Sequence, residues 1–225
     1  PQVFIGACGN TLRRTRGAGN LLKSVWPKFK LITTIDYRMS ATGRQSDLFL
    51  PAAAYYEKTD FRFPTAHLNF LVFTDKAVEP LGESKPEWEI SWRIAEKIEQ
   101  RARERGMNEY QDRRGRVFKL HGLRDRFGFN GEIGPYDDEK IAEDMIFDTV
   151  RAGALPERTT PNTLRKKGIV QFTHIGVDAV GQHQATDIER GKTVNPLTWH
   201  VRDKVPYPSY ARRIQFYIDH DWFLE

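Results

Sequence analysis

The chain has 225 residues, a formal net charge of +5 and 39% hydrophobic residues. Its basic residues are interleaved with 30 acidic ones, which favours a solvated surface or contact with an anionic cofactor over a nucleic-acid groove. The single cysteine, Cys8, excludes an intrachain disulfide, a Cys₂His₂ zinc site and a four-cysteine iron–sulfur cluster within these residues. No apolar run approaches the roughly 18 residues that a transmembrane helix needs.

The first part of the chain has the pattern of alternating strands and helices. Residues 2–7 and 31–35 are short apolar runs that predict strands, and residues 18–26 between them predict a helix. A strand, a helix and a strand in this order form a βαβ unit, so the two strands should be parallel. A third short run, residues 48–50, is closed by Pro51. These elements predict an α/β fold with a mainly parallel sheet flanked by helices, followed by an irregular C-terminal extension.

Small and polar residues follow the predicted strands at the edge where open α/β sheets bind ligands. A glycine turn after the first strand lets backbone approach a ligand closely, although its spacing is not that of the dinucleotide fingerprint G-x-G-x-x-G. Two carboxylates flank a polar segment after the second strand. The candidate cofactor-binding residues are Gly6, Gly9, Asn10, Asp36, Arg38, Ser40, Thr42 and Asp47.

Three further helices are indicated by apolar periodicity and by their ends. The clearest runs over residues 86–105, with a capping box of Ser84 and Glu87 and with Gly106 after its last turn. Its stripe of apolar residues predicts packing on one side through Trp88, Trp92, Ala95, Ile98 and Ala102. The others are residues 137–152, ended by Gly153, and residues 161–167, with Thr160 as cap and Gly168 as stop.

The connecting segments give weaker patterns. Residues 52–58 predict a helix or a packed turn, and residues 68–73 a strand. Residues 108–135 are polar and predict a long loop or an insertion. Residues 168–198 are expected to be irregular, and the alternation of residues 212–224 predicts a strand.

Four motifs, taken together and in this order, resemble the third domain of the dimethyl sulfoxide reductase family of molybdenum and tungsten enzymes. The resemblance is greatest to the type II branch, which holds nitrate, chlorate and selenate reductases, dimethyl sulfide dehydrogenase, and ethylbenzene and steroid C25 dehydrogenases. The motifs are D-Y-R-M-S-A-T-G, S-D-L-F-L-P-A-A, P-L-G-E-S-K-P-E-W and R-I-Q-F-Y-I-D-H-D-W-F-L-E.

The resemblance implies an oxidoreductase with a bis-molybdopterin guanine dinucleotide carrying molybdenum. The eight candidate residues match the positions that hold the guanosine diphosphate end of one of its two pterins. It further implies domains at residues 1–106, 107–204 and 205–225, the last being the start of the molybdopterin dinucleotide-binding domain. Because the chain starts at Pro1, we expect it to be an internal part of a catalytic subunit. The iron–sulfur cysteines and metal ligand would then lie elsewhere, so no catalytic residue is assigned.

The expected partners are the rest of that subunit, an iron–sulfur electron-transfer subunit and a haem subunit, without nucleic acid. The expected location is the periplasm of a bacterium or archaeon, or the cytoplasmic membrane face for a protein like nitrate reductase. The reaction would be hydroxylation of a hydrocarbon or steroid side chain, or reduction of an oxyanion. The motifs P-L-G-E-S-K-P-E-W and Y-A-R-R-I-Q favour the hydrocarbon and steroid enzymes.

Two alternative hypotheses for the function are open. A nicotinamide-dependent Rossmann enzyme would place a ribose-binding acid near Asp36, but the glycine fingerprint is missing. A basic nucleic-acid module would use the arginine-rich residues 113–126, but this stretch has few aromatic residues and no recognised binding motif.

Overall fold

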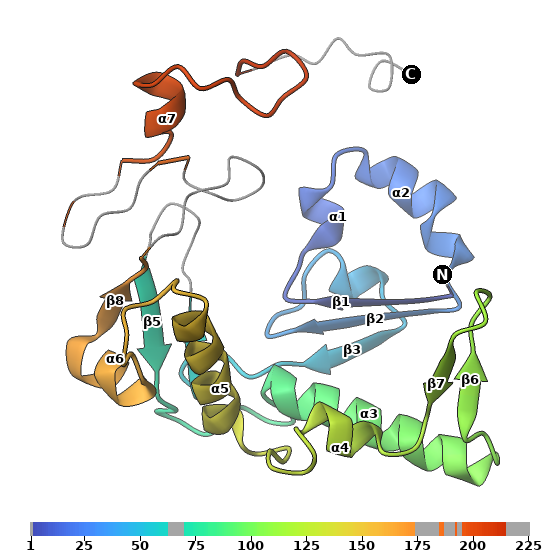
Figure 1. The fold of residues 1–225 in the computed structure, drawn as a ribbon. Coiled ribbons are helices and arrows are strands. Elements are labelled where there is room, and N and C mark those ends of the chain that lie inside the picture. Colours follow the sequence, from blue (N-terminus) through green and yellow to red (C-terminus); the bar gives the residue numbers. More distant parts are fainter. Residues whose placement is uncertain (1, 63–69, 174–184, 187–191, 193–194, 215–225) are drawn as a thin grey trace. The chain divides into compact units, whose positions relative to one another are not determined.

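The computed structural model describes residues 2–62, 70–173, 185–186, 192 and 195–214 (Figure 1). Contacts divide the chain into two compact units, which are described separately. The first contains Pro1–Asp60 and Thr74–Ile141, and the second contains Phe61–Phe73 and Ala142–Glu225. The domain boundaries at residues 106 and 204 remain a prediction. In the part of the chain that is described, no helix is long and apolar enough to cross a membrane.

The first unit is built on a three-stranded parallel sheet, as the sequence predicts. Its strands β1 (Val3–Ala7), β2 (Leu31–Asp36) and β3 (Leu48–Pro51) lie in the order β1-β2-β3. The central strand β2 is buried from its second residue to its last, which explains its continuous apolar and β-branched sequence. The predicted α/β class and the parallel strand pairing are therefore confirmed.

One face of this sheet is covered by the chain between β1 and β2. This chain forms the short helices α1 (Thr11–Arg14) and α2 (Ala18–Ser24) and a 3₁₀ turn, η1 (Trp26–Lys28). The predicted helix at residues 18–26 thus ends in a 3₁₀ turn that contains the proline. The apolar cluster beneath it consists of Leu12, Trp26 and Ile32, with Phe4, Leu21, Leu22 and Phe29 packed against it. A second 3₁₀ turn, η2 (Gly43–Gln45), leads into β3.

The long helix α3 (Glu87–Glu104) packs against the other face near the end of β3. The predicted capping box at its start is wrong. Pro86 is the N-cap residue and no side chain caps the helix; the Ser84 hydroxyl instead donates to the carbonyl of Leu81 at 2.7 Å. The prediction that Gly106 follows the last turn of this helix is confirmed. Gly106 has φ +64°, a left-handed conformation that glycine adopts readily.

Residues 108–135 are ordered, so the prediction of a long loop is wrong. They contain an antiparallel hairpin of β6 (Glu109–Gln111) and β7 (Val117–Lys119), followed by α4 (Leu123–Phe127). Helix α4 packs on the tryptophan stripe of α3: the rings of Trp88 and Phe127 are stacked with centroids 4.7 Å apart. The predicted stripe therefore does pack on one side, although its member Ile98 is exposed.

The second unit has a three-stranded sheet, in which β5 and β8 pair antiparallel, and helices packed with it. The strands β4 (Asp60–Arg62), β5 (Phe70–Thr74) and β8 (Ile169–Gln171) lie in the order β4-β5-β8. Strand β8 falls within residues 168–198, which the sequence predicts to be irregular; it is only three residues long and is defined by its pairing with β5. Residues 68 and 69 of the predicted strand at residues 68–73 lie outside the described residues.

Two helices of this unit agree with the sequence. They are α5 (Asp138–Arg151) and α6 (Pro161–Lys167). A third helix, α7 (Thr198–Val201), begins at the end of the stretch expected to be irregular and is not among the predicted helices. Thr160 caps α6 through a reciprocal capping box with Thr163. The apolar core is formed by Leu71, Phe73, Ala142, Ile146, Leu155, Leu164, Val170 and Phe172. Of the predicted strand at residues 212–224, residues 215–224 lie outside the described residues.

Candidate cofactor-binding site

The carboxyl ends of β1, β2 and β3 meet at one edge of the parallel sheet, and seven of the eight candidate residues lie there. The eighth, Asp47, precedes β3 and bonds to Ile32 near the amino end of β2. The turn after β1 begins at Cys8, whose φ of +53° is unusual for a residue other than glycine. The Cys8 amide donates to the carbonyl of Ile35 at 2.9 Å, which fixes the turn beside β2. A Cβ atom on Gly6 would lie 3.0 Å from the Phe4 ring, whereas one on Gly9 would make only ordinary contacts. Lack of space for a side chain therefore explains glycine at position 6 but not at position 9.

Asn10 and Thr42 fasten the first turn to the segment after β2. The Thr42 amide and hydroxyl both donate to Asn10 Oδ1, at 3.3 and 3.2 Å. The Thr42 hydroxyl in turn accepts from the amide of Leu12 at 3.0 Å, and Thr42 is fully buried. These two candidate residues, 32 positions apart, thus hold the two loops together.

Ser40 and Asp47 also bond to the protein's own backbone. Ser40 Oγ accepts from the amide of Gly43 at 3.2 Å. Asp47 Oδ2 accepts from the amide of Ile32 at 2.8 Å, and the Asp47 amide donates to the Ile32 carbonyl at 2.9 Å. Both side chains shape the segment between β2 and β3.

Asp36 and Arg38 differ from the other candidates. Asp36 is only 6% exposed, and its carbonyl accepts from the amide of Ala52 at 3.0 Å. Its carboxylate accepts no hydrogen bond from any residue that the structure describes, so it does not cap its own turn. Arg38 is exposed, with its guanidinium carbon 5.6 Å from the centroid of the Tyr37 ring. These two charged groups are the ones available to a ligand at the edge.

A cluster of charged residues that the sequence analysis missed lies at the same edge. Lys58 forms ion pairs with Glu87, at the start of α3, and with Asp60 at 3.5 Å. Its side chain is only 8% exposed. The Cys8 thiol donates to Glu87 Oε1 at 3.2 Å, so Glu87 joins the turn after β1 to the segment after β3.

Burial and charge shift the pKa values of this cluster. Burial, followed by the hydrogen bond and negative charge of Glu87, raises the pKa of the Cys8 thiol to about 11. Burial alone would raise the pKa of Glu87, but the hydrogen bond and positive charge of Lys58 outweigh it and hold that pKa below its ordinary value. At neutral pH the cluster therefore contains a neutral Cys8 thiol and an ionised Glu87 carboxylate.

No local pattern signals this cluster. Lys58 and Glu87 are 29 positions apart, and Cys8 and Glu87 are 79 apart. The one available signal in the sequence is a lysine two positions after the apolar and aromatic residues 48–56, since a buried lysine requires a carboxylate partner. Within the described residues, no group of three or more His, Cys, Asp or Glu side chains could hold a metal ion.

Comparison with known proteins decides the family. The family model of molybdopterin oxidoreductases matches residues 9–97, which include most of the edge described above. The alpha subunit of the respiratory nitrate reductase of Haloferax mediterranei is 35% identical over 221 residues, which cover 96% of this chain and 22% of that protein. The chain is homologous to the molybdopterin oxidoreductases. The resemblance found in its motifs is thereby confirmed.

Two more relatives match this chain over nearly its whole length. The perchlorate reductase alpha subunit of Dechloromonas aromatica is 30% identical, over 100% of this chain and 23% of that protein. The dimethylsulfide dehydrogenase alpha subunit of Rhodovulum sulfidophilum is 29% identical, over 98% and 23%. The chain spans less than a quarter of the length of these curated relatives. It is homologous to catalytic subunits of molybdenum-dependent oxidoreductases, and the family implies a molybdopterin cofactor.

Proposed function

We propose that the carboxyl edge of the β1-β2-β3 sheet binds the guanosine diphosphate end of a bis-molybdopterin guanine dinucleotide. The observation that carries this proposal is Asp36, a residue only 6% exposed at the carboxyl end of β2. Its carboxylate has no hydrogen-bond partner among the described residues, and its oxygens remain open to a ligand. A buried carboxylate without a donor is costly, and a ligand that supplies donors removes that cost. The residues at this edge therefore fit the nucleotide end of the cofactor that the family implies.

The chemistry of the edge suits the two polar parts of the nucleotide. Asp36 can accept hydrogen bonds from the N1–H and N2–H₂ donors of guanine or from ribose hydroxyls. The exposed Arg38 guanidinium and the backbone amides of Gly9 and Asn10, after the left-handed Cys8, suit phosphate oxygens. In this proposal, Asp36 and Arg38 contact the ligand directly.

The remaining candidates act through the backbone. Asn10 and Thr42 join two loops, and Ser40 and Asp47 fix the segment between β2 and β3. Such support holds the contacting groups in one geometry before the cofactor binds, which lowers the entropy cost of binding. Gly6 allows the close approach of the Phe4 ring beneath the turn.

For the whole protein we propose reduction of an oxyanion, because two of the relatives described above are a nitrate reductase and a perchlorate reductase. Molybdenum, when bound through the pterins, supplies the two-electron chemistry. Hydroxylation of a hydrocarbon or steroid side chain is the second candidate, favoured by the motifs at residues 80–88 and 210–215. An iron–sulfur subunit, a haem subunit and a periplasmic location complete the proposal. Reduced-viologen oxidation by the purified full-length enzyme with nitrate, perchlorate or chlorate distinguishes these reactions.

The nucleotide site is tested by Asp36→Ala in the full-length subunit. Loss of a charge-assisted hydrogen bond costs about 1.5–3 kcal/mol, so cofactor affinity should fall roughly 10- to 100-fold. Molybdenum and guanine nucleotide, measured per folded protein, should both decrease, while the melting temperature of cofactor-free protein changes little. Asp148→Ala, an exposed acid on α5, is the control and should load normally. Normal molybdenum and guanine content in folded Asp36→Ala would refute the assignment.

A further inference from the structure

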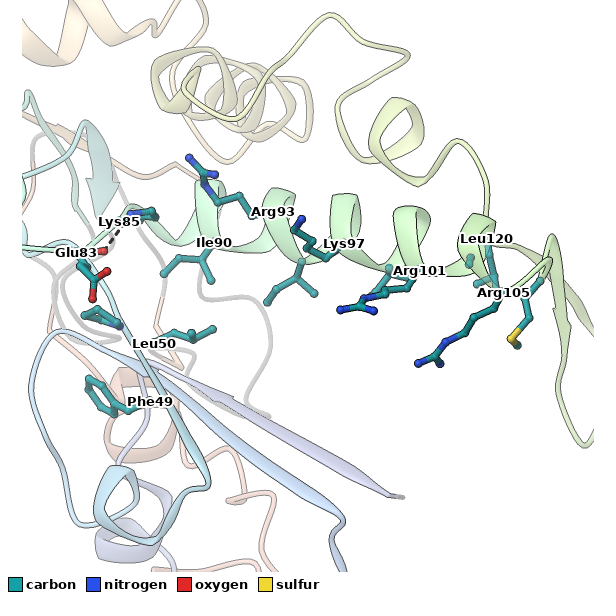
Figure 2. Close-up of a pocket in the computed structure, with 15 residues that line it drawn as sticks. Phe49, Leu50, Glu83, Lys85, Ile90, Arg93, Lys97, Arg101, Arg105 and Leu120 are labelled. Carbon is teal, nitrogen blue, oxygen red and sulfur yellow. Dashed lines mark hydrogen bonds between the residues drawn. The ribbon is translucent and has the colours of Figure 1, made fainter.

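A cleft of about 770 Å³ lies in the first unit between the edge strand β3 and helix α3 (Figure 2). Its apolar lining comes from both elements. Strand β3 contributes Phe49, Leu50 and Pro51, and α3 contributes mainly Ile90, Ile94 and Ile98. These apolar walls suit another apolar surface.

Helix α3 presents two adjacent stripes to this cleft. Ile90, Ile94, Ile98 and Ala102 recur every four residues and form an apolar stripe. Next to the apolar stripe runs a stripe of basic residues, again four positions apart, which Figure 2 shows along the helix. This stripe consists of Arg93, Lys97, Arg101 and Arg105. Residues four apart lie above one another on a helix, so both stripes run almost along its axis.

Much of the positive charge around the cleft is not neutralised. Among the described residues, Lys85, Lys97 and Arg105 form no ion pair with a carboxylate. Arg101 lies 3.6 Å from Glu104, an exposed pair that contributes little. Only Arg93 has a close partner, Glu89 at 2.7 Å. Glu83 is the one acidic residue in the lining. The rim of the cleft is thus complementary to a negatively charged partner.

The sheet face next to the cleft is also incompletely covered. The register places Leu50 beside Ile35, and both pack against α3 through Ile90. Toward the other end of the strands, the same face carries Ile5, 52% exposed, and Leu48, 46% exposed. Parallel sheets are normally covered on both faces, most often by helices. Part of this face therefore lacks a cover in the first unit.

We propose that the cleft receives an amphipathic helix from another part of the same full-length subunit, with an apolar stripe bordered by Asp or Glu residues. The apolar walls match the apolar stripe, and the row of unneutralised cations matches acids spaced four residues apart. A continuous sheet face and cleft resemble a domain core rather than a transient interface, which favours the same subunit over a second protein. The curated relatives have more than three quarters of their length outside the matched region, which is ample for such a helix.

The test uses lysine footprinting and zero-length carbodiimide cross-linking of the purified full-length subunit. Lys97 should be acetylated about tenfold more slowly than Lys23, because a carboxylate of the docked helix would pair with its amino group and limit access to it. Lys23 is an exposed helical lysine on α2 and serves as the internal control. Lys97 should also cross-link to an acid in an apolar-striped segment of the same polypeptide. Equal acetylation of Lys97 and Lys23, or cross-links from Lys97 to a different subunit, would overturn the proposal.

A pair of variants provides a second measurement. Lys97→Glu should lower the melting temperature of the full-length subunit, because it places a like charge against the acidic edge. Lys23→Glu should leave it unchanged. An equal effect of the two substitutions would also overturn the proposal.

Discussion

The fully buried side chains of the two units differ in chemistry. In the second unit they are Ile146 and Leu164, which lie in an apolar cluster with strands β5 and β8. In the first unit they are Thr34 and Thr42. Thr34 shares a 2.6 Å hydrogen bond with Ser46, and Thr42 bonds to Asn10 and Leu12. The second unit is thus held by apolar packing, and the edge of the first by a network of specific hydrogen bonds.

This difference indicates a division of roles. An apolar core offers no polar groups to a ligand, but it stabilises the fold in proportion to the apolar area that it buries. A hydrogen-bonded edge contributes less net stability per contact but fixes the positions of polar groups. Substitutions in the second unit should therefore reduce stability alone, and substitutions at the edge of the first should affect cofactor loading as well.

The largest effect is expected for Leu164→Ala in α6. The side chain is completely buried, so truncation should cost about 2–5 kcal/mol of the stability of the second unit. Faster amide hydrogen exchange in α6 measures this loss. Molybdenum content per folded protein should remain normal. A defect in cofactor loading without faster exchange would contradict the division of roles.

A smaller loss is expected for Glu87→Ala, which leaves the nearly buried Lys58 without its main partner. The expected cost is about 1.5–3 kcal/mol, the value of a hydrogen bond to a charged group. The pKa of Glu87 is below its ordinary 4.5, so this stability is present above that pH and is lost as the pH falls further. Denaturation curves of variant and unsubstituted protein should therefore converge in acid.

Glu79→Ala is the matched control for that substitution. Glu79 pairs with Lys76 at 2.6 Å, but its side chain is 85% exposed. Exposed pairs contribute little, so the control should change stability by less than about 1 kcal/mol. A pH-independent difference for Glu87→Ala would show that the ion pair is not the cause.

The two predicted helix caps can be compared directly. Thr160→Ala removes an observed capping box and should cost about 1 kcal/mol. Ser84→Ala removes a hydroxyl that bonds only to the Leu81 carbonyl outside α3, and should cost less than about 0.5 kcal/mol. Thermal unfolding measures both. A larger cost for Ser84→Ala would mean that the hydroxyl caps α3 after all.

The smallest effect concerns the Cys8 thiol. Its pKa of about 11 means that the rate of alkylation should keep rising with pH beyond the ordinary pKa of 9.0. The stability that accompanies this shift is present below pH 9 and is lost as the pH rises toward 11. Glu87→Gln removes the charge that faces the thiol and should bring the alkylation midpoint closer to 9. A midpoint near 9 in the unsubstituted protein would contradict the hydrogen bond from Cys8 to Glu87.

The sequence by itself determined the elements whose signals are local. The parallel order of β1, β2 and β3 follows from a βαβ pattern within the first 51 residues. The bounds of α6 follow from Thr160 at its start and Gly168 at its end. The four motifs that identified the family are also contiguous stretches, so they could be read without any structure.

Only the tertiary structure determined the hydrogen-bond and ion-pair partners of the polar side chains. Glu87 has the right spacing to cap α3 with Ser84, but it bonds instead to Lys58 and Cys8, because a buried ammonium group needs a carboxylate more than a helix end exposed to water needs a cap. The hairpin and α4 within residues 108–135 likewise depend on α3: Glu99, 3% exposed, accepts from the Gly122 amide and from Arg124. These contacts join residues more than 20 positions apart, and no local spacing in the chain encodes them.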